Sequence, residues 1–148
     1  MTASSKHQHK SKAELIAELE RLEMLIAGSD KGETAPIIRN TMVDAIEALQ
    51  DGLAIFDADE RLVLSNNKYL ELHPAVADVL VPGVHIADIV STAAQRGQHL
   101  NALHRDEAWV AERLKAFRNP GEPIEQEFSD GQWLRVYERK TADGGTVG

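Results

Sequence analysis

Residues 51–66 read DGLAIFDADERLVLSN, and this stretch decides how the chain folds. Two largely apolar segments, 53–56 and 61–65, flank the polar segment 57–60. Short apolar segments on either side of a polar turn are typical of paired antiparallel strands. Asn66 follows the second segment, and asparagine is a preferred N-cap residue of helices. We therefore predict a β-hairpin that leads directly into a helix.

The segment from Asn66 to about Gln98 has a broken helical pattern, with a short first helix that ends near Pro74. Its clearest helix ends at Gly97 and has apolar residues at the i, i+3, i+4 and i+7 positions, namely Ile86, Ile89, Val90 and Ala93. Another helix is expected from Asp106 to about Arg118, because acidic residues begin it and basic residues end it. Its predicted buried stripe is Val110, Leu114 and Phe117.

The C-terminal part has the pattern of β-strands. Residues 124–128 and 133–139 flank Ser129-Asp130-Gly131-Gln132, in which Asp-Gly favours a two-residue type I′ turn. The resulting register pairs Phe128 with Trp133, Gln126 with Arg135, and Ile124 with Tyr137. Asp143-Gly144-Gly145 forms another turn, and residues 146–148 begin a third strand.

This register gives the hairpin two different faces. One face carries Ile124, Gln126, Phe128, Trp133, Arg135 and Tyr137, and the other carries Glu125, Glu127, Leu134 and Val136. A register that differs by one residue is the open alternative, in which the aromatic residues belong to the core. If Leu134 and Val136 face inward, Glu125 and Glu127 do so too, which is costly without partners. A bulge or a polar pocket would resolve that conflict.

The N-terminal part is expected to contain a disordered tail, residues 1–10, and a helix with a linker, residues 11–40. Ser11-Lys12-Ala13-Glu14 has the form of a capping box. Leu15, Leu19, Leu22 and Ile26 follow at spacings of four, three and four, as in the seam of a coiled coil. The helix either packs on its own domain or forms a dimer seam, and both readings stay open. A second helix is predicted from Pro36 to Gln50.

Composition excludes several kinds of site. The 148 residues include no cysteine, which rules out disulfides, thiolate metal sites and cysteine nucleophiles. The net charge is −8, and a domain this acidic repels nucleic acid and anionic lipid. No leader-like or membrane-spanning run is present, so we predict a cytoplasmic protein. His7 and His9 are too few to hold a metal ion, and no nucleophile motif occurs, so we predict neither a metal site nor a catalytic residue.

The order of elements resembles the PAS fold, and two strings strengthen the resemblance. Residues 51–66 look like the opening hairpin of that family with its helix-starting asparagine. Residues 119–136, NPGEPIEQEFSDGQWLRV, followed by DGGTV at 143–147, are similar to a bacterial subfamily found in sensor histidine kinases and nucleotide cyclases. The resemblance covers about residues 41–148, which we assign as the PAS domain.

The resemblance implies an α+β fold, with a five-stranded antiparallel sheet and helices on one of its faces. The fifth strand of the family lies in the centre of the sheet, and here it has only begun by Gly148. We therefore expect the natural polypeptide to continue with an apolar strand and a helix leading to an effector. Leu134 and Val136 would face inward, so Phe128, Trp133 and Tyr137 would form an outer patch that needs cover.

The resemblance also implies a pocket between sheet and helices. We expect His85, Ile89, Leu134 and Val136 to line it. Cysteine-dependent flavin and coumaroyl chromophores are excluded, whereas haem and non-covalent flavin are not. Among the candidates His85, His99 and His104, His85 is best placed as an axial haem ligand. We nevertheless predict that no cofactor is bound.

Three functions are compatible with these residues. The first is a sensory PAS module that dimerises through Leu15, Leu19, Leu22, Ile26 and the outer face of the sheet, and relays a signal to a C-terminal effector. That effector would be a histidine kinase, or alternatively a diguanylate or adenylate cyclase. The second is a ligand-free structural dimerisation module. The third is a small α+β enzyme, which would need titratable groups converging in a cavity.

Overall fold

The computed structural model describes residues 16–17, 19–21 and 34–148. The chain divides into two compact units, residues 1–50 and Asp51–Gly148. In the first unit, residues 16–17 and 19–21 are helical, and helix α2 spans Thr34–Glu47. Helix α2 confirms the helix predicted from Pro36, and it runs through the domain boundary predicted at residue 41. Of the predicted leucine seam, Leu19 is described and buried, whereas Leu15, Leu22, Ile26 and the tail 1–10 lie outside the described residues.

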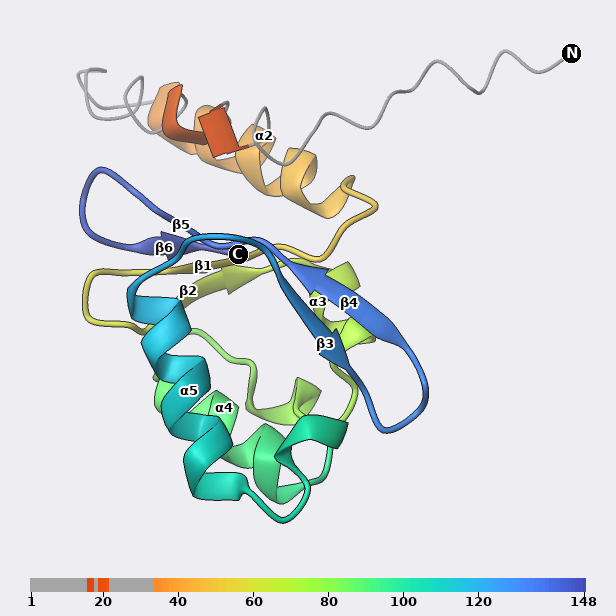
Figure 1. Ribbon diagram of the computed structural model, residues 1–148. Coiled ribbons are helices and arrows are strands. Elements are labelled where there is room, and N and C mark those ends of the chain that lie inside the picture. Colours follow the sequence, from red (N-terminus) through yellow and green to blue (C-terminus); the bar gives the residue numbers. More distant parts are fainter. Residues whose placement is uncertain (1–15, 18, 22–33) are drawn as a thin grey trace, which may run out of the picture. The chain divides into compact units, whose positions relative to one another are not determined.

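The second unit contains a four-stranded antiparallel sheet with the order β2-β1-β6-β5 (Figure 1). Its strands are β1 (Ala54–Phe56), β2 (Leu62–Ser65), β5 (Arg139–Lys140) and β6 (Thr146–Val147). Strands β1 and β2 confirm the predicted opening hairpin. The short β6 pairs with β1 on one side and with β5 on the other. The last strand of the chain therefore occupies the centre of the sheet, as the resemblance implied.

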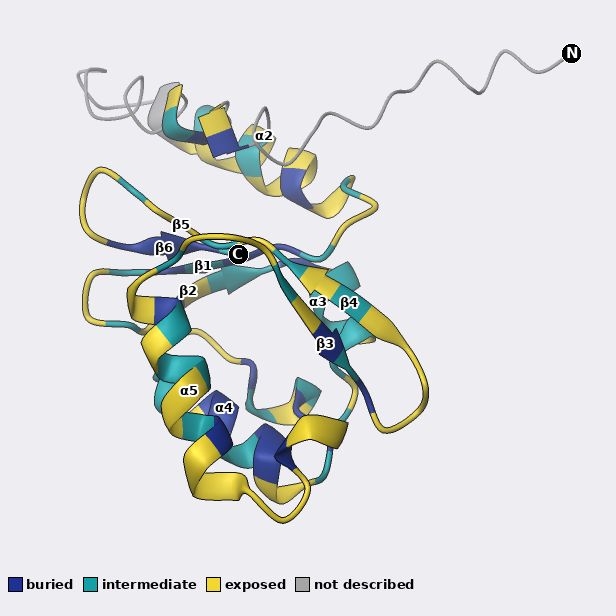
Figure 2. Cartoon of the chain, in the orientation of Figure 1, coloured by how far each residue is buried: buried dark blue, intermediate teal, exposed yellow. Residues whose placement is uncertain are grey.

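Helices cover one face of this sheet (Figure 1). They are α3 (Asn67–Leu72), α4 (Ile86–Gln95) and α5 (Asp106–Arg118), with 3-10 turns η2 (Ala77–Val79) and η3 (Leu100–Ala102) between them. The four apolar residues predicted for the α4 stripe are all buried. Figure 2 shows the buried positions of α4 and α5 turned toward the interior. There they join Phe56, Leu62 and Val76 in one continuous core.

The side chain of Asn66 connects the first hairpin to α3 through hydrogen bonds. Its Oδ1 accepts hydrogen bonds from the backbone N–H of Tyr69 and of Leu53, both at 2.9 Å. Its Nδ2 donates to the carbonyl oxygen of Asp51 at 2.9 Å. The side chain is fully buried, so each of these bonds replaces a contact with water. Asn66 thus confirms the predicted helix cap and additionally holds the entry to β1.

The predicted register of the second hairpin is wrong by one residue. In the structure, β3 (Ile124–Glu127) and β4 (Trp133–Val136) pair Glu127 with Trp133 and Gln126 with Leu134. Phe128 N–H donates to the carbonyl of Gln132 at 2.8 Å, which closes a three-residue loop rather than the predicted two-residue turn. Gly131 has φ 89°, the left-handed conformation that such loops require at their third position.

The corrected register changes which side chains share a face. Directly opposed residues of antiparallel strands lie on one face, so Gln126 and Phe128 join Leu134 and Val136 on the inner side. Phe128 is accordingly buried, and its assignment to the outer patch is wrong. Trp133 and Tyr137 remain outside, as predicted. Glu125 and Glu127 also lie on the outer side, which removes the conflict that the sequence raised.

The expected single strand 133–139 is in fact two strands. Tyr137 and Glu138 interrupt it between β4 and β5. As a result, β3 and β4 form a separate two-stranded ribbon instead of completing a continuous five-stranded sheet. The interruption places Glu138 where it meets α5.

Candidate functional site

An aromatic cluster with two histidines fills the interior between the helices and the β3–β4 ribbon. His99 stacks on Trp109 with ring centroids 4.6 Å apart and meets the edge of Phe128 at 4.6 Å. His73 stacks on Tyr69 at 4.2 Å and also approaches Phe128. These side chains come from α3, α5, the segment before η3 and the end of β3, so the cluster joins four parts of the fold.

Burial keeps the ring groups of this cluster uncharged at neutral pH. Loss of solvent lowers the pKa of His99 to about 4, and the neighbouring His73, once protonated, and Arg113 act in the same direction. Burial also lowers the pKa of His73. It raises the pKa of Tyr69 to about 12. The amide of Gln98 lies 2.9 Å from His99 Nε2 and donates to it, so the neutral imidazole carries its proton on Nδ1.

A buried ion pair lies beside this cluster. Arg113 Nη2 donates to Glu138 Oε1, and the two side chains are 13% and 7% exposed. The pair joins α5 to the interruption between β4 and β5. Four atoms of this region are buried without a hydrogen-bond partner among the described residues: Gln98 Oε1, His99 Nδ1, Arg113 Nη1 and Glu138 Oε2. Such atoms are rare in protein interiors and mark a polar centre.

A hollow of about 250 Å³ opens between α5 and β3. Side chains of α5 and of the preceding turn line one side, and strand β3 lines the other. The lining residues are His99, Asn101, Arg105, Trp109, Glu112, Arg113, Ala116 and 124–127. This volume lies below the range of about 300–1,000 Å³ typical of sites for drug-sized ligands. It suits one side chain or a small molecule better than a haem or a flavin.

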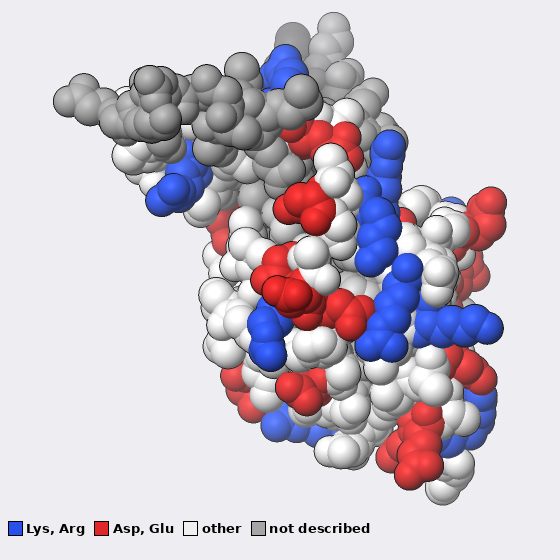
Figure 3. All heavy atoms as spheres, turned by 90° about the vertical axis from the view of Figure 1, so that its left-hand side faces the viewer, with Lys and Arg blue, Asp and Glu red and all other residues white. Residues whose placement is uncertain are grey.

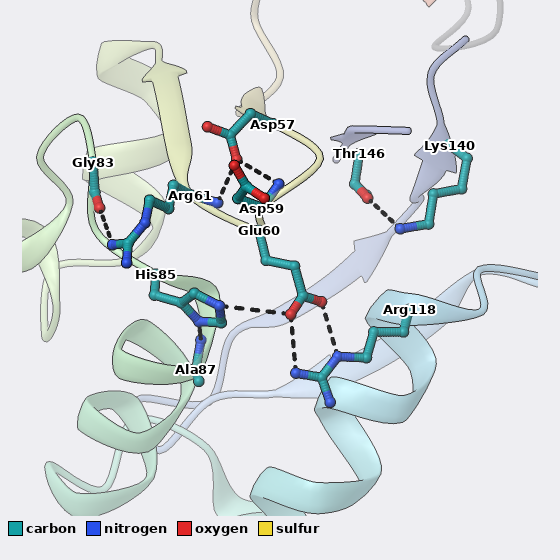
Figure 4. A network of polar contacts seen from close by, with 10 residues as sticks. All are labelled: Asp57, Asp59, Glu60, Arg61, Gly83, His85, Ala87, Arg118, Lys140 and Thr146. Carbon is teal, nitrogen blue, oxygen red and sulfur yellow. Dashed lines mark hydrogen bonds and ion pairs between the residues drawn. The ribbon is translucent and has the colours of Figure 1, made fainter. Parts of the chain in front are cut away.

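His85 has a different position from the one expected. It caps α4, where its Nδ1 accepts from the backbone N–H of Ala87 at 3.0 Å. Its Nε2 lies 3.6 Å from Glu60 Oε1 (Figure 4). Both ring nitrogens therefore face protein groups, and His85 does not line the hollow.

The other predicted pocket residues are placed as follows. Ile89 is buried in the core on α4, and Leu134 and Val136 are half-buried on the inner face of β4. None of the three lines the hollow. His99, which the sequence offered as a lesser candidate, does line it. His104 is exposed in the loop before α5.

Sequence reasoning missed Trp109, Arg113 and Glu138. Trp109 and Arg113 are four residues apart on α5, so they lie on the same side of the helix, next to the predicted stripe. A predicted buried face that included Trp109 would have covered that side of the helix as well. Nothing in the sequence marked Glu138 as special, because residues 133–139 have the pattern of one continuous strand.

Glu60 forms a second polar centre at the hairpin turn (Figure 4). It adopts φ 63°, and its carboxylate accepts from Arg118 Nε and Nη2 at 2.8 and 3.0 Å. The hydrogen bond and charge of Arg118 lower the pKa of Glu60. Asp57 Oδ1 accepts from the backbone of Asp59 and Arg61, which fixes the turn. These contacts connect the hairpin to α4 and α5. The acidic residues of the turn therefore have a structural role.

The described residues contain no grouped metal ligands, and charges of both signs lie on the face drawn in Figure 3. Within the described ranges, no group of three or more metal-ligating side chains lies together. In the same residues, no helix combines the length and the apolar character needed to cross a bilayer. Figure 3 shows acidic and basic side chains interspersed on the face drawn.

Comparison with known proteins identifies the fold family. The family model of the PAS fold matches residues 46–148, and the chain therefore belongs to that family. Its α+β architecture with an antiparallel sheet is that of a PAS domain. The fold predicted from the sequence is thus confirmed.

The individual proteins that resemble this chain have low sequence identity to it. The chain is 29% identical over 113 residues to the "Non-motile and phage-resistance protein" of Caulobacter vibrioides, a match that spans 76% of this chain and 12% of that protein. A domain of the sensory box sensor histidine kinase/response regulator from Geobacter sulfurreducens is similar with a TM-score of 0.41 and 18% identity, over 78% of this chain and 96% of that one. The PAS domain of Bordetella pertussis BvgS gives 0.41 and 22%, over 74% and 82%.

Proposed function

We propose that this PAS domain is a cytoplasmic sensory and dimerisation module of a larger bacterial signalling protein, and that its output domain is a histidine kinase. Membership of the PAS family supports the signalling role. The kinase assignment rests on the similarity of residues 119–147 to the PAS subfamily found in kinases and cyclases. The domain itself has no catalytic role in this proposal.

The observation that carries the proposal is the Arg113–Glu138 ion pair. Arg113 borders the hollow, and Glu138 immediately precedes β5, which pairs with the central strand β6. Glu138 also lies beside the C-terminal residue, since a Cβ added to Gly148 would be 3.4 Å from Glu138 Cγ. A change in the hollow that moves Arg113 would therefore move the edge strand β5 and, through it, its partner β6.

The relay is tested in the parent protein with a neutral replacement of the pair. The double variant Arg113→Met, Glu138→Leu removes both charges and keeps apolar bulk, so the domain should fold. We expect the autophosphorylation rate to change about threefold or more, as residues that couple two sites do. The control Arg96→Met removes a surface partner of Asp78, away from the hollow, and should leave the rate unchanged.

An unchanged rate in a folded double variant would show that the pair does not relay the signal. Formation of a cyclic nucleotide in place of phosphohistidine would show that the output is a cyclase. Both results can be told apart from loss of folding by a thermal melt of each variant.

Dimerisation is proposed through the N-terminal residues Leu15, Leu19, Leu22 and Ile26 together with the outer face of β4. Trp133 is 61% and Tyr137 37% exposed, and both lie on the outer side of the ribbon, where large aromatic side chains favour a partner surface. Trp133→Glu should shift the protein toward monomer in sedimentation velocity, and deletion of residues 1–33 should do the same. A wild-type chain that is monomeric at high micromolar concentration would contradict the proposal.

A further inference from the structure

Two buried polar side chains of the hollow have no hydrogen-bond partner. Trp109 on α5 is 8% exposed and Gln126 on β3 is 7% exposed, and both residues line the hollow. Neither the indole N–H of Trp109 nor the side-chain amide of Gln126 hydrogen-bonds to any described residue. Buried polar groups normally have partners, so each of these two needs an explanation.

Both groups can be reached from the hollow. The described atoms that are fully enclosed and without a partner are the four of the neighbouring polar centre: Gln98 Oε1, His99 Nδ1, Arg113 Nη1 and Glu138 Oε2. The indole and amide groups are not among them, so each keeps some exposed surface. Since more than nine-tenths of both residues is buried and both line the hollow, that exposed surface faces into it.

The free groups define what a ligand must offer. The indole of Trp109 is a donor, and the amide of Gln126 has a carbonyl acceptor beside an NH2 donor. A primary carboxamide has the same two groups side by side, so it can exchange two hydrogen bonds with Gln126. Its carbonyl oxygen has a second lone pair, which can accept from Trp109. A carboxamide therefore satisfies both side chains at once.

The charges around the hollow favour a neutral ligand. Arg105 pairs with Glu112 at 2.7 Å, and Arg113 pairs with Glu138, so both guanidinium groups of the lining are already neutralised. The other charged residues of the lining are the carboxylates Glu125 and Glu127, on the outer side of β3. An anion would meet paired cations and added negative charge, whereas a cation would be buried beside two guanidinium groups. An uncharged molecule avoids both costs.

The size and the apolar lining limit the rest of the ligand. A cavity of about 150 Å³ is enough to hold benzene. The hollow has about 250 Å³, which admits a single ring with one polar substituent. The ring of Trp109 and the side chains of Ala116 and Ile124 supply its apolar surface.

We propose that the hollow between α5 and β3 binds a small neutral molecule with an apolar body and a primary carboxamide. The carboxamide pairs with Gln126, and the apolar body lies against Trp109 and Ile124. The proposal rests on the sensory function proposed above and deepens it, because it names the class of ligand that acts on the hollow beside Arg113.

The test uses the 148-residue chain with Trp133→Phe. This variant leaves Trp109 as the single tryptophan, so its indole N–H gives one assignable NMR signal. The probes are benzamide, benzoate and benzamidinium, which share a shape and differ in charge. We expect a saturable shift of the indole signal with benzamide and binding of both ions that is weaker by about tenfold or more.

Two results would overturn the proposal. Ligands of this size bind a suitable site with dissociation constants of about 10 mM or less, so the absence of a saturable shift at that concentration of benzamide would exclude the site. Binding of either ion as tightly as benzamide would refute the assignment of a neutral ligand.

The variant Gln126→Leu tests the amide contact. It replaces an unpartnered buried amide with an apolar side chain of similar size, so the fold should be kept, which a thermal melt checks. The affinity for benzamide should fall about tenfold, because two hydrogen bonds are lost. The matched control is Gln132→Leu, the same chemical change at an exposed loop residue, and it should leave the affinity unchanged. Equal affinities of the two variants would show that Gln126 does not hold the ligand and would overturn the proposal.

Binding and signalling are measured separately. Saturating benzamide should change the autophosphorylation rate of the parent protein if the relay through Arg113 operates. Binding to the 148-residue chain without any change in that rate would support the ligand class and contradict the proposed relay.

Discussion

Arg113 on α5 and Glu138 between β4 and β5 form an ion pair that is almost entirely removed from solvent. A buried pair stabilises a fold little compared with apolar residues of the same size, but removal of one partner leaves a buried charge uncompensated. We expect Glu138→Gln to lower the free energy of unfolding by about 3 kcal/mol. The double variant Arg113→Met, Glu138→Leu should return to within about 1 kcal/mol of the wild type. Urea denaturation of the three proteins measures these differences, and equal losses in the single and double variants would contradict the expectation.

His99 makes stability depend on pH. Its pKa of about 4 lies below the ordinary value of 6.5, so the unfolded chain binds a proton more readily than the folded one between these values. Stability is therefore fully present above pH 6.5 and is lost as pH falls toward 4, by about 2 kcal/mol between pH 7 and pH 5 from this group alone. His73 acts in the same direction.

The measurement is urea denaturation at pH 7 and pH 5. His99→Phe should flatten the pH dependence, although the variant is less stable at pH 7 because it leaves the Gln98 amide without its acceptor. His104→Ala, on an exposed loop residue, is the control and should keep the wild-type slope. A pH slope that His99→Phe leaves intact would assign the effect to other groups.

Asn66 should be among the most sensitive polar positions of the domain. Asn66→Ala removes the cap of α3 and leaves the buried N–H of Leu53 without its acceptor. The cap contributes about 1 kcal/mol and an orphaned buried donor costs about 1–3 kcal/mol, so a total loss of about 2–4 kcal/mol is expected. Asn40→Ala on the exposed side of α2 serves as the control. Similar melting temperatures for the two variants would rule out this role.

Gly145 allows the close approach of β6 to β1. A Cβ at this position would overlap the carbonyl oxygen of Phe56 and lie 3.0 Å from Thr141 Oγ1. Gly145→Ala should therefore cost about 2 kcal/mol or more by overpacking at the centre of the sheet. Gly121→Ala has nothing within 4 Å of the new methyl group and should be neutral. Chemical denaturation compares the pair, and equal midpoints would show that the strands can separate at no cost.

We expect the purified domain to carry no haem. Both ring nitrogens of His85 face protein groups, and the hollow is smaller than sites for large cofactors. Its absorption spectrum should therefore contain only the near-ultraviolet bands of tryptophan and tyrosine and no band in the visible range. A Soret band that disappears in His85→Ala would assign His85 as an iron ligand after all.

The helices and the first hairpin could be predicted because their signals are local. The stripe of α4 and the cap at Asn66 each depend on residues within one or two turns. The register of the second hairpin could not be predicted in this way. Asp130-Gly131 is compatible with two loop lengths, and the structure selects the longer one, in which Asp130 Oδ1 accepts from Gln132 N–H. That single difference moves Phe128 from the surface to the core.

The candidate site was harder to predict than the fold. Its central pair joins a helix residue to a strand interruption 25 positions later, and neither residue belongs to a motif. His99 was noticed as a histidine, but its contact with Trp109 depends on how the segment before η3 turns back onto α5. Long-range packing of this kind leaves no periodic trace in the sequence.

The pairing of Ile55 with Val147 has a consequence for how the domain assembles. The two residues are separated by nearly the whole domain, so their ladder requires closure of a very long loop, whereas the β1–β2 hairpin and the packing of α4 on α5 involve near neighbours. The local elements can thus form early, while the middle of the sheet closes late. Until it closes, β1 exposes a bare edge, and this interval is when a nascent chain would be most vulnerable to mispairing and most in need of a chaperone.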